Sequence, residues 1–107
     1  MFKKYKMDLT QIEWAGQLKN DQNAVVLDVR TREEFEEKRL EHSINIDIYT
    51  GQAFIYDVDA LDKTKNYFVY CKAGGRSAQA CSIMNELGFA NAYNLAGGIM
   101  NWEGKTI

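Results

Sequence analysis

The chain is 107 residues long, and its 13 lysines and arginines against 15 aspartates and glutamates give a formal net charge of −2. Its length predicts a single domain spanning residues 1–107, and its 46% hydrophobic and 26% charged residues are typical of a globular protein rather than a disordered one. Because nucleic-acid-binding proteins carry a basic excess, this balance argues against that class, and we interpret the cluster Lys3, Lys4 and Lys6 as a solvated tail.

The cysteine content and the apolar runs indicate a compartment. Cys71 and Cys81 are too few for a disulfide framework, and they lack the paired spacing of a zinc site. No apolar run approaches the ~18 residues of a membrane span, and the first nine residues lack the apolar stretch of a signal peptide. We therefore expect a cytoplasmic protein with reduced thiols and no membrane partner.

The first predicted helix covers residues 11–19. Thr10 and Glu13 have the spacing of a capping box, in which each side chain accepts a hydrogen bond from the other residue's backbone N–H. Leu9 and Trp14 occupy the positions of a hydrophobic staple around that cap. The sequence thus predicts both where this helix begins and which two apolar side chains pack together at its N-terminus.

A strand and a second helix are predicted next. Residues 24–29 form a short apolar run rich in valine, which is typical of a strand covered on both faces. A second capping box, Thr31 to Glu34, opens a short charged helix with Phe35 and Leu40 as inward residues. Residues 44–46 form a brief strand.

The second half repeats the alternation of strand and helix. Residues 51–61 are ambiguous, and we expect irregular structure with a helical turn there. A strand over 67–70 ends at Cys71, and the helix that follows has an apolar stripe and stops at Gly88. A last strand covers 92–95. A short final helix carries Ile99, Met100 and Trp102. This order predicts an α/β domain with a mainly parallel central sheet flanked by helices.

The segment that follows the strand at 67–70 carries the chemistry. In an open α/β sheet ligands bind beyond the carboxyl ends of the strands, which is where Cys71 falls. Small residues allow successive N–H groups to point inward as an anion-binding nest, and the next helix adds its free N-terminal N–H groups. These donors favour a thiolate. The predicted site is the nucleophile Cys71 with the cradle Lys72, Ala73, Gly74, Gly75, Arg76 and Ser77.

Three segments together resemble the rhodanese-like domain family. The run CKAGGRS at 71–77 is similar to the family's active-site loop, Cys-x-x-Gly-x-Arg-Ser/Thr. Residues 27–35, LDVRTREEF, resemble its first signature, and residues 95–102, LAGGIMNW, resemble its terminal one. The resemblance spans roughly Leu9 to Trp102 and implies a three-layer rhodanese-like fold.

The resemblance implies a sulfurtransferase without a metal or organic cofactor. In the family the cysteine takes the outer sulfur of a donor such as thiosulfate, becomes a persulfide, and passes that sulfur to cyanide or a thiol. By analogy the backbone N–H groups of Lys72 to Ser77 form the cradle, Lys72 recruits an anionic donor, and Arg76 orients the loop or adds positive potential. The implied partners are this donor and acceptor, or a protein sulfur acceptor, and a compact domain suggests a monomer.

Other candidate residues receive structural interpretations. The family's stretch before its short strand is poorly kept at 38–45, where the lone His42 replaces a usual glycine, so we assign His42 no catalytic role. Asp28, Arg30 and Glu34 are interpreted as a charge network rather than a catalytic base. Cys81, within an apolar helix stripe, is interpreted as core packing, with resolution of a Cys71 persulfide as the alternative.

Two other functions compete with sulfur transfer. Related cysteine loops in phosphatases and arsenate reductases hold five residues between cysteine and arginine, whereas this loop holds four, a length that suits one sulfur better than a phosphate. A regulatory or sulfur-carrier module with little turnover is the second alternative. Retention of Cys71 favours an active or sulfur-carrying domain over a purely regulatory one.

Overall fold

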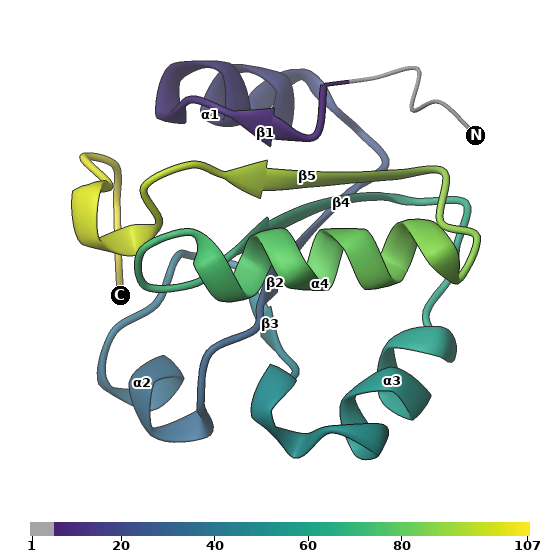
Figure 1. Ribbon diagram of the computed structural model, residues 1–107. Helices are drawn as coiled ribbons and strands as arrows, with labels where there is room; N and C mark the ends of the chain where they lie inside the picture. Colours follow the sequence, from purple (N-terminus) through teal and green to yellow (C-terminus); the bar gives the residue numbers. More distant parts are fainter. Residues whose placement is uncertain (1–5) are drawn as a thin grey trace.

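A computed structural model describes residues 6–107 and shows a five-stranded sheet in which all paired strands are parallel (Figure 1). The strand order is β1-β5-β4-β2-β3, so β4 and its neighbours β5 and β2 are internal. The bounds are β1 Asp8–Leu9, β2 Ala24–Asp28, β3 Ile44–Asn45, β4 Asn66–Tyr70 and β5 Asn91–Leu95. The expected mainly parallel α/β architecture is confirmed.

Four α-helices and two 3-10 helices flank the sheet in the described part of the chain. They are α1 Gln11–Asn20, α2 Arg32–Glu37, α3 Gln52–Asp59 and α4 Gly75–Glu86, with η1 Ile48–Thr50 and η2 Ile99–Asn101. Both predicted capping boxes are present, on Thr10 with Glu13 and on Thr31 with Glu34. α4 ends where Gly88 adopts a left-handed conformation, as its position after the apolar stripe predicted.

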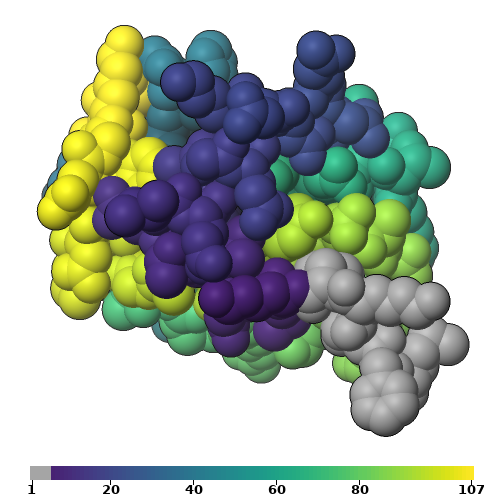
Figure 2. Space-filling view, turned by 90° about the horizontal axis from the view of Figure 1, so that it is seen from above, coloured from purple at the N-terminus to yellow at the C-terminus, as the bar shows by residue number. Residues whose placement is uncertain are grey.

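The two faces of the sheet are covered by different elements because successive side chains of a strand point to opposite sides. On β4, Tyr67 and Val69 pack with residues of α3 and α4, whereas Phe68 and Tyr70 pack with Trp14 of α1 and with the C-terminal segment. Figure 2 looks down on the second face, where α1 and the C-terminal residues lie side by side. The result is a three-layer arrangement with β4 at its centre.

The segment 51–61 corrects an expectation of the sequence analysis. Instead of irregular structure it contains α3, an eight-residue helix whose Phe54 and Val58, one turn apart, are fully buried against the sheet. Gly51 precedes the helix with a positive φ and offers no side-chain cap, so the sequence lacks a start signal there. The packing of these two side chains against the sheet therefore stabilises the helix in place of an N-terminal cap.

Two smaller features were also missed. The short strand β1 exists only through its pairing with β5, with Asp8 opposite Asn94 and Leu9 opposite Leu95. Leu40 is buried as expected, but it lies beyond the end of α2 and forms an isolated antiparallel bridge with Thr106. Neither feature has a local periodic pattern.

The turn after Leu40 explains the glycine that the resemblance expected there. His42 has a φ of 66°, a left-handed conformation that favours glycine. Its side chain is 88% exposed, with only the flanking Glu41 carboxylate nearby at 3.9 Å. His42 is therefore a non-glycine residue in a conformation that glycine adopts without strain.

Two expectations concern the N-terminal segment and membranes. Lys3 and Lys4 of the expected basic tail lie outside the described residues, and Lys6 forms an exposed ion pair with Glu13 at 3.2 Å. Among residues 6–107 there is no helix with the length and apolar character needed to cross a membrane.

Candidate active site

The reactive candidate lies at the carboxyl end of the central strand. Cys71 directly follows β4 and continues its alternation, so its side chain falls on the face that α4 covers. The chain then turns through Lys72, Ala73 and Gly74 into the N-terminus of α4. In Figure 1 this turn meets the C-terminal segment and lies at the same end of the sheet as α2. The topology therefore gathers three distant segments around one thiol.

Hydrogen-bond donors converge on the sulfur of Cys71. The Gly74 amide donates to Sγ at 3.0 Å, the Ser77 hydroxyl lies 3.2 Å from it, and the amides of Ala73 and Ser77 also point to it. Gly74 reaches this geometry with a φ of 108°, which a side chain would strain. Of the expected cradle, the amides of Ala73, Gly74 and Ser77 thus act on the sulfur.

Burial and hydrogen bonding act on the thiol in opposite directions. Cys71 is only 1% exposed, and burial alone would raise its pKa because a thiolate is poorly solvated in the interior. The donors from Ser77, Gly74 and Ala73 outweigh this effect and lower the pKa of Cys71 below its ordinary value. The loop therefore substitutes fixed dipoles for water around an anionic sulfur.

The two cationic residues of the loop differ in their surroundings. Arg76 donates to both oxygens of Glu34 at 2.8 and 3.1 Å, and its guanidinium lies 5.2 Å from the centre of the Tyr49 ring. This bidentate bond from Arg76 lowers the pKa of Glu34 to about 2. Lys72 is exposed. Arg76 thus connects α4 to α2 through its ion pair with Glu34, while Lys72 faces solvent.

A second set of contacts holds the loop from the C-terminal side. The amides of Ile99 and Met100 donate at 2.9 Å to the carbonyls of Cys71 and Lys72. A Cβ on Gly98 would come within 2.3 Å of the Lys72 carbonyl oxygen, so only glycine fits there. The contact of Gly98 with Lys72 was not predicted, although adjacent glycines are a sequence signal for a sharp turn or a close approach.

The polar residues of the first signature form a buried ion pair beside the loop. Arg30 donates to Asp28 at 2.7 Å and to the Lys38 carbonyl at 2.6 Å, and both side chains of the ion pair are almost fully buried. Asn45 donates to the carbonyls of Asp28 and Arg30, which fixes β3 against this turn. These bonds support the interpretation of Asp28 and Arg30 as a structural network.

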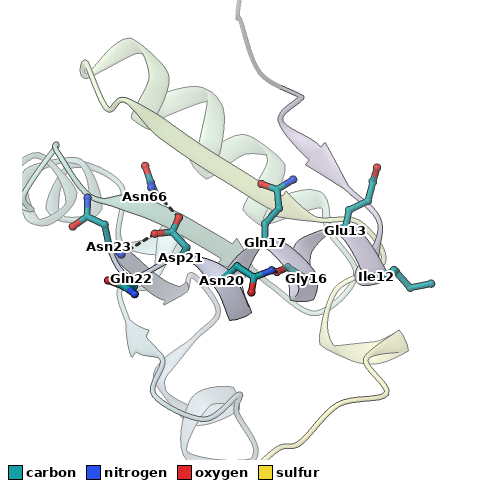
Figure 3. A pocket seen from close by; sticks show the side chains of 9 residues that line it. All are labelled: Ile12, Glu13, Gly16, Gln17, Asn20, Asp21, Gln22, Asn23 and Asn66. Atoms are coloured by element: carbon teal, nitrogen blue, oxygen red, sulfur yellow. Dashed lines mark hydrogen bonds between the residues drawn. The ribbon is translucent and has the colours of Figure 1, made fainter.

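Two further features lie outside the loop. Burial raises the pKa of Cys81, which is fully buried on α4. Figure 3 shows a surface pocket beside α1, lined mostly by polar residues, where Asp21 accepts hydrogen bonds from the backbone N–H of Asn23 and from Nδ2 of Asn66. Within residues 6–107 no group of three or more histidine, cysteine or acidic side chains is placed to hold a metal.

Comparisons with known proteins agree with this geometry. The family model described as Rhodanese-like domain matches residues 11–105. The chain is 31% identical over 103 residues to YtwF of Bacillus subtilis, a provisionally named sulfurtransferase. The aligned region covers 94% of this chain and 96% of that protein. The crystal structure of a rhodanese-related protein from Thermoplasma volcanium superposes with a TM-score of 0.79 at 27% identity, covering 95% and 98% of the two chains.

A relative with a different name also matches. The tRNA uridine(34) hydroxylase of Pelagibacter ubique is 34% identical over 87 residues, or 81% of this chain. The match spans only 29% of that enzyme. The similarity therefore concerns one part of the hydroxylase and does not extend to the activity of the whole protein.

Proposed function

The chain belongs to the rhodanese-like domain family, and from this premise we propose that it is a sulfurtransferase that carries sulfane sulfur as a persulfide on Cys71. A sulfurtransferase-named relative of nearly the same length supports a transferase of this family. The observation that carries the finer proposal is the convergence of the Gly74 amide and the Ser77 hydroxyl on the Cys71 sulfur.

The first step loads the enzyme. The Cys71 thiolate attacks the outer sulfur of thiosulfate, a bond forms between the two sulfurs, and the bond from the outer sulfur to the sulfonate sulfur breaks. The bonding pair leaves with sulfite, and the negative charge of the thiolate passes to the terminal sulfur of the persulfide. A lowered pKa of Cys71 raises the fraction of thiolate that can react near neutral pH.

The second step removes the terminal sulfur from the Cys71 persulfide. A nucleophile, cyanide in an assay or a thiolate, attacks the terminal sulfur, and the sulfur–sulfur bond breaks with return of its electron pair to Cys71. The thiolate so formed is the same anion that the loop donors stabilise at the start. Each half-reaction therefore ends with an anionic sulfur in reach of fixed N–H groups.

The residues of the loop divide these tasks. The backbone N–H groups of Ala73, Gly74 and Ser77 stabilise sulfur, as the pKa of Cys71 indicates. Lys72 is exposed and free to attract a dianionic donor as it approaches. Arg76 orients the start of α4 through Glu34 rather than meeting the donor directly. We propose that Gly75, the first residue of α4, leaves space beside the loop, since no heavy atom outside its own helix and neighbours lies within 4 Å of where its Cβ would be.

One experiment tests the proposal. The purified protein is incubated with thiosulfate, its intact mass is recorded, and cyanide is added while thiocyanate is measured. We expect one added sulfur and catalytic thiocyanate formation in the wild type, with both lost in Cys71→Ala and both kept in Cys81→Ala. Equal rates for wild type and Cys71→Ala would overturn the assignment.

The same assay separates a transferase from a sulfur carrier, and a phosphatase assay tests the other alternative. An added sulfur with no turnover would indicate a carrier that delivers sulfur to a protein acceptor. Hydrolysis of a phosphoryl ester that is lost in Cys71→Ser would instead indicate a phosphatase, which the four-residue spacing from Cys71 to Arg76 argues against. The cytoplasmic location, the monomeric state and the absence of nucleic-acid and membrane partners stay predictions from the sequence.

A further inference from the structure

Two buried polar side chains, Ser77 and Asn94, connect the Cys71 loop to the exposed Asp8 on the edge strand β1. Ser77 on α4 is fully buried, and its hydroxyl is bonded to the Oδ1 atom of Asn94 on β5. Asn94, 4% exposed, donates from Nδ2 to the Asp8 carboxylate at 2.8 Å and to the Gly74 carbonyl at 3.3 Å. Asn94 was not singled out by the sequence, because it lies within an ordinary strand pattern.

The orientation of the Asn94 amide is fixed by what surrounds it. The Asp8 carboxylate and the Gly74 carbonyl are both acceptors, so the NH₂ group must face them and the amide oxygen must face Ser77. An amide oxygen has no proton to give. Ser77 is therefore the donor in its bond with Asn94.

The hydroxyl of Ser77 has one proton and three acceptors in reach. These are Oδ1 of Asn94, which is closest, Sγ of Cys71 at 3.2 Å and the Gly74 carbonyl at 3.3 Å. When the proton points to Asn94, a lone pair of Ser77 faces Cys71, and that lone pair suits a neutral S–H group. When Cys71 ionises, the proton must turn from Asn94 to the sulfur.

We propose that Asn94 is a positioning residue that accepts the hydrogen bond of the Ser77 hydroxyl whenever the Cys71 sulfur is neutral and loses this bond to the sulfur when the sulfur becomes a thiolate. The hydroxyl turns back to Asn94 when the inner sulfur is neutral within a persulfide. Asn94 thus opposes ionisation of Cys71 through Ser77 and limits the time the empty enzyme spends as a thiolate. This rests on the proposed function only in taking Cys71 as the reactive group.

Other charged and titratable groups also act on this sulfur. Arg76 on α4 carries a charge that interacts with this sulfur, Lys72 adjoins it in the loop, and Asp8 on β1 lies behind Asn94, while burial keeps the neighbouring Cys81 a neutral thiol. Arg76 acts directly through space, whereas Asn94 acts through the Ser77 hydroxyl. A double-mutant cycle separates the two routes because only the Asn94 effect requires Ser77.

The test measures the pKa of Cys71 from the pH dependence of its alkylation by iodoacetamide, with the modified peptide identified by mass. We expect Asn94→Ala to raise the thiolate-to-thiol ratio about three- to tenfold, the equivalent of one competing hydrogen bond. Ser77→Ala should lower that ratio, and the double variant should match Ser77→Ala alone. Asn94→Leu, which keeps the number and branching of the side-chain heavy atoms, repeats the measurement if Asn94→Ala fails to fold.

A matched control lies on the same strand. Asn91 donates to Asn66 at 2.8 Å at the other end of β5, so Asn91→Ala removes a similar amide and should leave the pKa of Cys71 unchanged. An unchanged or lowered thiolate ratio in Asn94→Ala and Asn94→Leu, or an equal shift with and without Ser77, would overturn the proposal. Alkylation needs no sulfur transfer, so failure of the persulfide assay alone would contradict the proposed function and leave this cycle interpretable.

Discussion

The two cysteines of this chain show how differently one fold can treat the same thiol. Cys71 and Cys81 are separated by ten positions, both are at most 1% exposed, and both belong to the same apolar cluster between the sheet and α4. The pKa of Cys71 is nonetheless lowered, whereas burial raises that of Cys81. Burial is common to both, so it does not decide which thiol ionises.

Hydrogen-bond donors make the difference. Cys81 lies in the middle of α4, where backbone N–H groups are used within the helix, and no donor to its sulfur is found in the described part of the chain. Cys71 lies just before the helix begins, where the first N–H groups have no helical partner. A thiol placed one helical turn ahead of the first residue of α4 thus gains donors that a thiol inside it lacks.

The largest expected effect is on reactivity. At pH 8 we expect iodoacetamide to modify Cys71 at least about 100-fold faster than Cys81, because the pKa of Cys71 is lowered, that of Cys81 is strongly raised, and each pKa unit between them changes the thiolate fraction about tenfold. Peptide mass mapping after timed quenching measures both rates. Comparable rates in the folded protein would contradict the claim that the loop donors activate Cys71. Unfolding in denaturant is the control, and it should make the two alkylation rates similar.

The next effect comes from opening the loop. Gly98→Ala places a Cβ against the Lys72 carbonyl at a residue with a φ of 64°, so we expect at least a tenfold loss of sulfur transfer and a loss of about 2 kcal/mol or more of unfolding free energy. The pKa of Cys71 should then rise toward that of an ordinary cysteine, which narrows the difference in alkylation rate from Cys81. Gly16→Ala is the control, since its Cβ meets nothing and alanine stabilises a helix by roughly 0.5–1 kcal/mol.

A smaller effect is expected from the Arg76–Glu34 pair. The pKa of Glu34 in the fold is about 2, below its ordinary 4.5, so its contribution is present above about pH 4.5 and is lost as the pH falls toward 2. Glu34→Gln should lower the unfolding free energy by about 1 kcal/mol at pH 7. Denaturant melts at pH 7 and pH 2.5 measure this, and a difference from wild type that persists undiminished at pH 2.5 would contradict the assignment.

The smallest effect should come from the charge of Lys72. Because Lys72 is exposed and the sulfur is held by amides, Lys72→Gln should leave the pKa of Cys71 nearly unchanged. We expect the KM for thiosulfate to rise about two- to fivefold at low salt and less at 0.5 M salt, where a surface charge is screened. A large fall in kcat would show that the full charge, rather than the amides, activates the thiol.

Much of this contrast could be predicted from local sequence. The strand ending at Cys71, the glycine turn and the helix that follows are adjacent in the chain, so the donors that surround the sulfur could be predicted from spacing alone. The capping boxes at Thr10 and Thr31 are local in the same way. Cys81 could be placed in the core from the apolar stripe around it.

What escaped prediction depends on contacts between distant residues. α3 has no cap and is held by Phe54 and Val58, and β1 is defined by its partner strand. The roles of Asn94 and Gly98 come from approaches to Ser77 and Lys72 across 17 and 26 positions of the chain. Local periodicity carries no information on such pairs, which only the packing of β5 beside β4 creates.

The bonds from Ile99 and Met100 to the Cys71 loop have a consequence for biosynthesis. Protein chains are made from the N-terminus, so the cysteine leaves the ribosome well before the residues that clamp its loop. Until residues 98–100 have emerged and docked, the turn that fits against Lys72 is not in place. A nascent chain that lacks these residues therefore has a cysteine whose loop is not yet held, and the lowered pKa of Cys71 comes only after they dock.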